Sequence, residues 1–104
     1  PANLELALQL ANKFYDVGEF NKAIVYYLKY VSINKNNPNV LVDLGTPYYY
    51  NGQFDEAEKY LLKAHEINPE HQIALLNIGV VKKAMGDVEL AKEYWNKAYT
   101  IAPN

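Results

Sequence analysis

The amino-acid sequence predicts an all-α protein in which three antiparallel helix pairs stack into a right-handed α-α superhelix, or solenoid. The first observation is a repeat, because a shift of 34 positions aligns Gly18 with Gly52 and Gly86 in a chain of 104 residues. The same shift aligns further columns of identical residues: Ala23, Ala57 and Ala91; Tyr26, Tyr60 and Tyr94; Lys29, Lys63 and Lys97; Ile33, Ile67 and Ile101. The second observation is that apolar residues on both sides of each glycine recur at three- and four-residue steps, the spacing of one helical face. A fixed period of this kind indicates units that bury their apolar faces by stacking on their neighbours.

The first unit contains two helices, predicted at residues 3–16 and 20–33. The first apolar stripe ends before Gly18, and glycine closes helices because it accepts the left-handed conformation. The second stripe ends at the polar run from Asn34 to Asn37. The apolar positions of the two stripes are Leu4, Ala7, Leu10, Ala11 and Phe14, then Phe20, Ala23, Ile24, Tyr27, Tyr30 and Ile33.

The second and third units predict helices at 38–50, 54–67, 71–84 and 88–101. We expect Asn37-Pro38 and Asn68-Pro69 to begin helices, since asparagine is a good N-cap and proline is favoured in the first turn. We also expect small residues to mark the points where the two helices of a pair cross closely. A glycine inside a helix costs about 1 kcal/mol relative to alanine, and a close helix contact would offset that cost. These small residues are Ala23, Ala57, Ala91, Gly45 and Gly79.

Pro47 lies inside the helix predicted at 38–50, where a proline removes one backbone hydrogen bond and clashes with the carbonyl of Asp43. Gly45 precedes it by two residues, so a bend is expected here. One interpretation is a kink that packing absorbs. The other is a bend that widens a binding groove or permits a domain-swapped arrangement. Under both, replacing Pro47 with alanine is expected to raise the melting temperature.

The composition is that of a folded domain, with 50% apolar and 21% charged residues. All ten basic residues are lysine and the net charge is −2, so the chain lacks the basic field and the arginines that nucleic acids favour. No apolar run approaches the roughly 20 residues of a membrane span. Cysteine is absent, which suits any compartment, and we favour the cytoplasm.

Residues for catalysis or for a cofactor are not gathered in the sequence. His65 and His71 are six residues apart and lack the four-residue spacing of a helical metal pair. Ser32 is the only serine and has no histidine at a plausible distance in the repeat geometry. The glycines follow the repeat and do not form a phosphate-binding loop. We therefore expect no enzyme activity, no cofactor and no metal site.

The repeat columns resemble the signature of the tetratricopeptide repeat family. In the second unit the matching residues are Leu44, Gly45, Tyr48, Gly52, Phe54, Ala57, Leu61, Ala64 and Pro69. In the third they are Ile78, Gly79, Gly86, Ala91, Trp95, Ala98 and Pro103. The first unit departs from the signature at Ala11, Tyr30 and Lys35. The resemblance implies one domain over residues 1–104, with repeats at about 4–37, 38–71 and 72–104.

The resemblance also implies a protein–protein interaction module that binds a peptide or helix in a concave groove lined by the first helix of each pair. An apolar track with tyrosines at one end and interspersed polar groups favours a ligand with apolar anchors. The predicted groove residues are Leu8, Asn12, Tyr15, Val42, Asp43, Thr46, Tyr49, Tyr50, Ile73, Leu76, Asn77, Val80 and Lys83.

One subtype of the family binds the C-terminal acidic tails of heat-shock chaperones with lysine, asparagine and arginine side chains. The corresponding places here hold Leu8, Asn12, Asp43, Ile73 and Asn77. Only Asn12 fits the subtype, and Asp43 would repel a carboxylate. We therefore expect a partner other than a chaperone tail.

The alternative function is a structural module that self-assembles through its ends. Solenoids close with a polar capping helix, and none follows the third unit in this sequence. We expect a segment excised from a longer protein whose last helix leaves apolar surface open, which promotes homo-oligomers. The residues expected there are Leu90, Tyr94, Lys97 and Ile101, with Trp95 and Ala98 turned inward.

Overall fold

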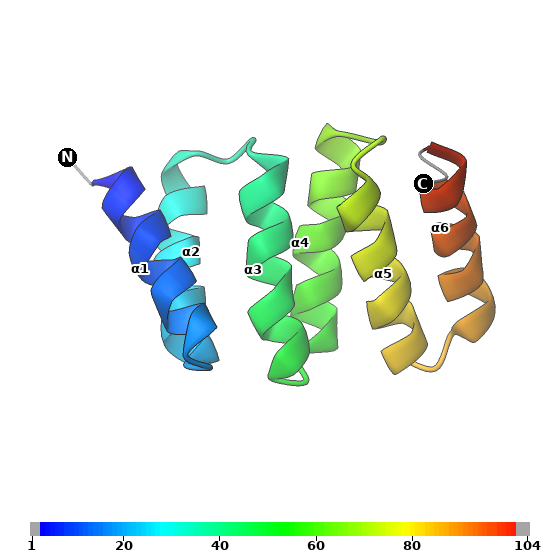
Figure 1. Cartoon of the computed structure of the whole chain (residues 1–104), viewed down its shortest axis with the longest axis horizontal. Coiled ribbons are helices and arrows are strands. Elements are labelled where there is room, and N and C mark those ends of the chain that lie inside the picture. Colours follow the sequence, from blue (N-terminus) through cyan, green and yellow to red (C-terminus); the bar gives the residue numbers. More distant parts are fainter. Residues whose placement is uncertain (1–2, 102–104) are drawn as a thin grey trace.

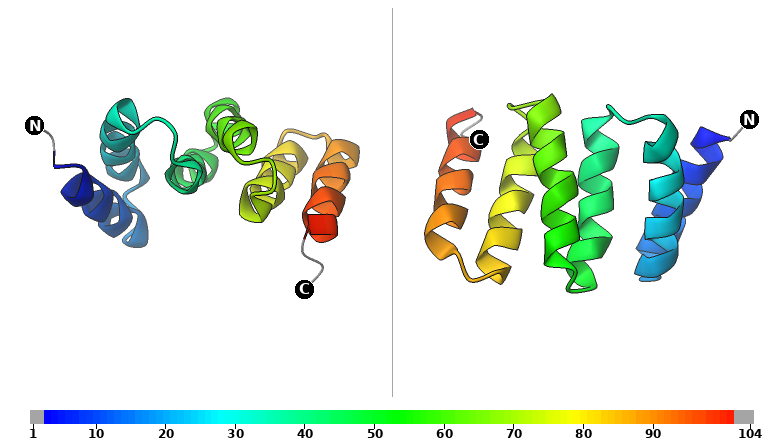
Figure 2. Two further views of the ribbon diagram at one scale, coloured as in Figure 1. Left: turned by 90° about the horizontal axis from the view of Figure 1, so that it is seen from above. Right: turned by 180° about the vertical axis from the view of Figure 1, so that it is seen from behind.

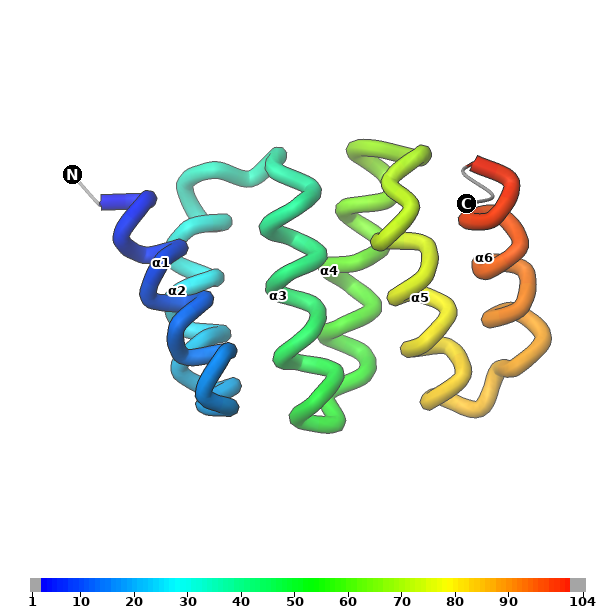
Figure 3. Tube along the Cα trace, viewed as in Figure 1, coloured from blue at the N-terminus to red at the C-terminus, as the bar shows by residue number. Residues whose placement is uncertain are grey.

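The computed structural model describes residues 3–101, which form six α-helices and no strand (Figure 1). Seen from above in Figure 2, the second helices of the first two pairs lie to one side of the row of first helices, and the last helix lies beside the fifth. The chain runs alternately up and down through successive neighbours, so the pairs stack side by side in a right-handed superhelix of 42 × 25 × 22 Å (Figure 3). The helices are α1 (Leu4–Asp16), α2 (Phe20–Ile33), α3 (Pro38–Tyr50), α4 (Phe54–Ile67), α5 (Gln72–Ala84) and α6 (Val88–Ile101). The predicted fold class and helices are confirmed, with bounds that differ by one residue at the starts of α1 and α5.

Each helix pair turns at its glycine. Gly18, Gly52 and Gly86 have φ angles of +80°, +75° and +95°, which residues other than glycine rarely adopt. In the first pair the N–H of Gly18 donates to the carbonyl of Tyr15 at 3.0 Å, and the N–H of Glu19 donates to that of Phe14 at 2.8 Å. These bonds satisfy carbonyls at the end of α1 and fix the angle at which α2 returns.

The starts of α3 and α5 differ from each other, and one prediction is wrong. Asn37 caps α3 as predicted, and its side-chain oxygen accepts the N–H of Asn39 at 3.1 Å. Asn68 instead caps the end of α4, where its backbone N–H donates to the carbonyl of Ala64, and its side-chain oxygen accepts the N–H of Glu70 at 3.1 Å in a local turn. The cap of α5 is His71, whose Nδ1 accepts the N–H of Ala74 at 3.1 Å.

The predicted close crossings are confirmed. The three alanines of the second helices are fully buried: Ala23, Ala57 and Ala91. A Cβ atom built on Gly45 would lie 2.8 Å from Cγ of Leu61, and one built on Gly79 would overlap the indole of Trp95. The glycine therefore leaves the space that the large side chain of the second helix fills.

Pro47 sits inside α3 without ending it, since the helix continues to Tyr50. Its ring is fully buried, so the residue also contributes to packing. On the next turn the N–H of Asn51 donates to the Pro47 carbonyl at 3.0 Å. The hydrogen bond that Pro47 cannot donate is the one that would otherwise reach the carbonyl of Asp43.

Within residues 3–101, no helix combines the length and the apolar character needed to cross a lipid bilayer. Pro103, which the sequence analysis included in the third repeat, lies outside the described residues.

Candidate functional site

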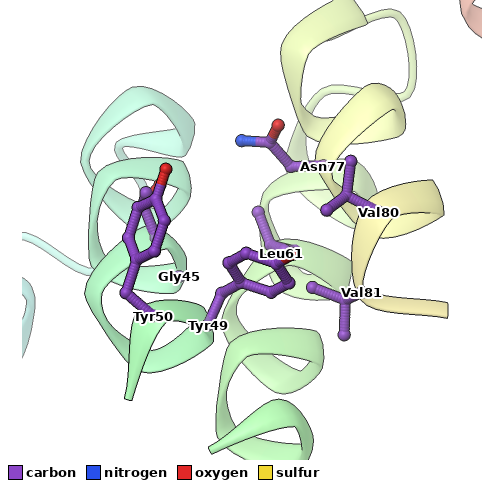
Figure 4. Close-up of a pocket in the computed structure, with 8 residues that line it drawn as sticks. Gly45, Tyr49, Tyr50, Leu61, Asn77, Val80 and Val81 are labelled. Atoms are coloured by element: carbon purple, nitrogen blue, oxygen red, sulfur yellow. The ribbon is translucent and has the colours of Figure 1, made fainter. Parts of the chain in front are cut away.

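Two adjoining hollows lie between successive first helices. The aromatic hollow, of about 190 Å³, lies between α3 and α5 with α4 behind it (Figure 4). The polar hollow, of about 160 Å³, lies between α1 and α3 with α2 behind it. Thr46 lines both, so the two hollows adjoin at this residue, and we call them together the groove. The aromatic hollow is lined by Gly45, Thr46, Tyr49, Tyr50, Leu61, Asn77, Val80 and Val81, and the polar hollow by Asn12, Tyr15, Tyr27, Asp43 and Thr46.

Rings and aliphatic side chains form most of the aromatic hollow. Figure 4 shows Tyr50 on one side, Asn77 and Val80 on the other, and the Tyr49 ring between them. The ring centroids of Tyr49 and Tyr50 are 5.4 Å apart in an edge-to-face arrangement. Tyr50 also stacks on Phe20 at 5.3 Å, which ties the hollow to the first repeat. Such contacts hold aromatic side chains in place before a ligand binds.

Hydroxyl and amide groups surround the polar hollow. The hydroxyl of Tyr27 donates to the side-chain oxygen of Asn12 at 2.5 Å. Burial, reinforced by the charge of Asp43, raises the pKa of Tyr27, and burial together with the neighbouring Tyr50 hydroxyl raises the pKa of Tyr15. Both phenols therefore stay protonated at neutral pH and keep their hydrogen-bond donors.

Asp43 is the acidic group of the polar hollow. Its side chain reaches solvent, yet the surrounding protein limits its hydration and raises the pKa of the carboxyl group, while His71 acts in the opposite direction. The ion pairs of the described residues lie elsewhere and leave Asp43 without a lysine partner: Lys22–Glu19, Lys82–Glu58 and Lys92–Glu89.

Most of the predicted groove residues converge on the two hollows. The aromatic hollow contains Thr46, Tyr49, Tyr50, Asn77 and Val80, and the polar hollow contains Asn12, Tyr15, Asp43 and again Thr46.

Five predicted residues lie elsewhere. Val42 was predicted to face the groove but is only 5% exposed and belongs to the hydrophobic core. Leu8 packs against the same core. Ile73, Leu76 and Lys83 are exposed on α5 and line neither hollow.

Four lining residues were not among the predicted ones: Gly45, Leu61, Val81 and Tyr27. The sequence does carry a signal for two of them, because Tyr27, Leu61 and Trp95 are 34 residues apart. A large residue of the second helix in this column lies opposite the small residue of the first helix, as Leu61 does over Gly45. The floor of the groove therefore comes from the second helices.

A second exposed surface lies at the outer side of the third repeat. Tyr99 is 65% exposed and Ile73 57%. Leu76 is 41% exposed, although Val42 stands in the same column of the second repeat and is buried. The indole N–H of Trp95 donates to the Leu76 carbonyl at 3.1 Å and links the two helices. We call Ile73, Leu76, Trp95 and Tyr99 the end face.

The open residues of α6 differ in part from those predicted. Ile101 and Lys97 are exposed as expected, and Ala98 is buried as expected. Leu90, Tyr94 and Trp95 are each half-buried, so Trp95 is less enclosed than predicted. Tyr99, which was not predicted, is the most exposed aromatic residue of the helix.

The two histidines have structural contacts. His71 caps α5, and its Nε2 lies 2.7 Å from the side-chain oxygen of Asn39. His65 packs edge-on against the ring of Tyr94, with centroids 6.4 Å apart. Residues 3–101 hold no group of three or more histidine, aspartate or glutamate side chains placed to bind a metal ion.

Comparisons with known proteins agree with the fold. Models of the tetratricopeptide repeat match residues 4–37, 38–71 and 73–104. The structure of MamA superposes with a TM-score of 0.92 at 27% identity, over 97% of this chain and 59% of that chain. The Sgt2 domain of Aspergillus fumigatus superposes with a TM-score of 0.92 at 25% identity, over 100% of this chain and 69% of that chain.

The first such domain of Spaghetti (RPAP3), solved with the HSP90 peptide SRMEEVD, has a TM-score of 0.92 at 23% identity, over 97% of this chain and 80% of that chain. At that identity the likeness concerns the fold alone. A search of curated proteins gave no significant match. The chain spans less than two thirds of the MamA chain. Domains of this kind are generally non-catalytic modules for protein interaction. Since the repeat models cover nearly all of the sequence and the six helices form three stacked pairs, the chain belongs to the tetratricopeptide repeat family.

Proposed function

We propose that this chain is a non-catalytic protein–protein interaction module that binds a peptide segment of a partner protein in its groove. The observation that carries the proposal is the aromatic hollow, which is preformed, open to solvent and lined by Tyr49, Tyr50 and Val80. A concave apolar site with a few polar groups at its edge is the usual form of a binding site.

The hollow suits one apolar anchor of a peptide. Transfer of a leucine- or phenylalanine-sized side chain from water contributes about 1.5–3 kcal/mol. Asn77 in the aromatic hollow and Asn12 in the polar hollow offer amide groups that can pair with a peptide backbone. The anchor supplies affinity, and the amides fix the direction of the chain.

An acidic C-terminal tail is a poor ligand for this groove. Asp43 lines the polar hollow together with Asn12, so a ligand carboxylate that enters this hollow meets a like charge. Arginine is absent from the whole sequence. We therefore propose that the partner of this chain differs from the HSP90 peptide that the RPAP3 domain binds.

The test is a peptide-display selection followed by affinity measurement on a charged variant. Val80→Asp places a carboxylate at the aromatic hollow, and selected peptides are expected to bind at least about tenfold more weakly, since a buried unpaired charge is costly. Val25→Asp is the matched control, because Val25 is exposed on α2 and lines neither hollow. Equal losses in the two variants, or none in Val80→Asp, would contradict the proposal.

The end face favours self-assembly as a second candidate function. It exposes apolar side chains on two adjacent helices, and patches of this kind promote association. Head-to-tail stacking of copies is opposed by Lys13, which stands in the column of the buried residues Pro47 and Val81. The arrangement that remains is a symmetric pair in which two end faces meet.

Sedimentation velocity over a range of concentrations tests this arrangement. The wild-type chain is expected to form a dimer that Tyr99→Glu shifts to the monomer, with no change in peptide binding. The groove variant Val80→Asp is a poorer probe of assembly because α5 contributes to both surfaces. A wild-type chain that stays monomeric at millimolar concentration would exclude the second function.

A further inference from the structure

The polar hollow holds a carboxylate, that of Asp43, which none of the ion pairs among residues 3–101 neutralises. Asp43 has no ion pair with any lysine among residues 3–101. His71 is the base that acts on Asp43, and it lowers the pKa of the carboxyl group. Both ring nitrogens of His71 are occupied, because Nδ1 accepts the N–H of Ala74 and Nε2 lies 2.7 Å from the Asn39 oxygen. His71 therefore acts on the pKa of Asp43 through electrostatics, while its two ring nitrogens form hydrogen bonds with other residues.

A second acidic group, Asp16, also acts on this end of the groove. Asp16 at the end of α1 and Asp43 on α3 both act on the hydroxyls of Tyr15 and Tyr27. The hydroxyl proton of Tyr27 is already donated to Asn12. The carboxylate of Asp43 therefore offers a negatively charged hydrogen-bond acceptor to whatever enters the hollow.

We propose that the groove selects a partner segment in which a lysine or arginine side chain accompanies an apolar one. The cationic group pairs with Asp43 in the polar hollow, and the apolar side chain enters the aromatic hollow. This inference rests on the proposed peptide-binding function and names the chemistry of the peptide. Charge complementarity with Asp43 and the shared wall at Thr46 carry it.

The spacing of the two groups follows from α3. Asp43, Thr46 and Tyr49 are three residues apart in turn, so Asp43 and Tyr49 are separated by about 9 Å along the helix at 1.5 Å per residue. An extended peptide advances about 3.3 Å per residue. For an extended ligand that runs along α3, the cation and the apolar anchor are therefore expected two to three residues apart.

Charge selection is tested with a defined peptide array. The probes are N-acetylated, C-amidated nonapeptides that carry one fixed leucine or tyrosine anchor and Lys, Gln or Glu two or three residues away on either side. Capping the termini leaves the side chain as the only source of charge. For the wild-type chain the Lys peptides are expected to bind about tenfold more tightly than the Glu peptides, since a charge-assisted hydrogen bond is replaced by repulsion.

Substitutions at Asp43 separate charge recognition from general peptide binding. Asp43→Asn keeps the shape and is expected to remove the preference, and Asp43→Lys is expected to reverse it. Asp55→Asn is the control, because Asp55 is exposed at the start of α4 and lines neither hollow. Circular dichroism establishes that each variant retains its helices.

The outcomes distinguish the two proposals. Peptides that bind without regard to charge, but are lost with Val80→Asp, would overturn the charge selection and leave the binding function standing. A preference for Lys that persists in Asp43→Asn would also overturn it. Peptides that fail to bind the wild-type chain at any charge would overturn both.

Discussion

The pKa of Asp43 reflects the environment of the groove. Its carboxyl group is raised in pKa because the surrounding protein limits its hydration, despite the opposing effect of His71. A group that favours its protonated form in the folded state makes folding less favourable once it ionises. The site therefore carries a stability cost at neutral pH that a cationic ligand would offset.

Asp43→Asn is expected to raise the melting temperature at pH 7. The wild-type carboxylate is disfavoured in the folded state at that pH, and the amide removes the penalty. As pH falls through the raised pKa of folded Asp43 to the unfolded value of about 3.9, wild-type stability approaches that of the variant.

Thermal unfolding of both chains between pH 3 and pH 8 measures the difference. His71 is present in both chains, so its direct contribution largely cancels. A gap in melting temperature that is as large at pH 3 as at pH 7 would show that ionisation of Asp43 is not its cause.

The predictions that are wrong also concern single residues. Val42 and Asp43 are neighbours on α3, so their side chains point about 100° apart, and one is buried while the other reaches the groove. The apolar periodicity identifies the helix, but it does not determine which of two neighbouring residues faces the groove. Asn68 has the same composition cue as Asn37, yet its side chain closes a turn, because two hydrogen-bonded outcomes compete for the same oxygen.

The helices themselves follow from the repeat. Glycine at the turn, alanine at the crossing and large residues opposite small ones recur at each step of 34, so every local preference agrees with the fold. The groove was only partly predictable, because its floor comes from Tyr27 and Leu61 on the second helices. Residues of the second helices that reach the groove are not part of the pattern of the first helices, from which the groove residues were predicted.

At Pro47 the low helix propensity of proline opposes the favourable packing of its buried ring. Inside a helix proline is about 3 kcal/mol less favourable than alanine. Its buried ring, however, contributes packing that alanine loses, roughly 2 kcal/mol for two methylenes with their cavity. The balance favours Pro47→Ala by about 1 kcal/mol, which is a rise of roughly 4–8 °C in melting temperature.

Pro38→Ala is the matched control, because Pro38 occupies the first turn of α3, where proline removes no helical hydrogen bond. That substitution is expected to leave stability unchanged or to lower it. Calorimetry of the two variants decides the issue, and size-exclusion chromatography of Pro47→Ala tests the domain-swap hypothesis. A lower melting temperature for Pro47→Ala would show that packing outweighs the missing bond.

On the scale of the whole molecule the structure is a stack in which each helix packs mainly on its neighbours in sequence (Figure 1). Stability in such a chain is close to a sum of repeats and the interfaces between them. The second repeat has an interface on both sides, whereas the first and third each have one described interface. Local opening should therefore begin at the ends.

Native-state hydrogen exchange is expected to show the slowest amides in α3 and α4 and faster exchange in α1 and α6. Tyr99→Glu is expected to leave this ranking unchanged in the monomer, because Tyr99 is exposed. A uniform exchange rate across the six helices would mean that the chain opens as one cooperative unit.

Thr46, on the shared wall of the two hollows, has a consequence for how a ligand must lie. Its hydroxyl donates to the carbonyl of Val42 at 3.2 Å, so the proton is committed to its own helix. Only the oxygen lone pairs and the methyl group of Thr46 remain to contact a ligand. A peptide that passes from one hollow to the other can therefore form a hydrogen bond with Thr46 when one of its backbone N–H groups points toward α3. This requirement fixes the orientation of the peptide backbone at the centre of the groove.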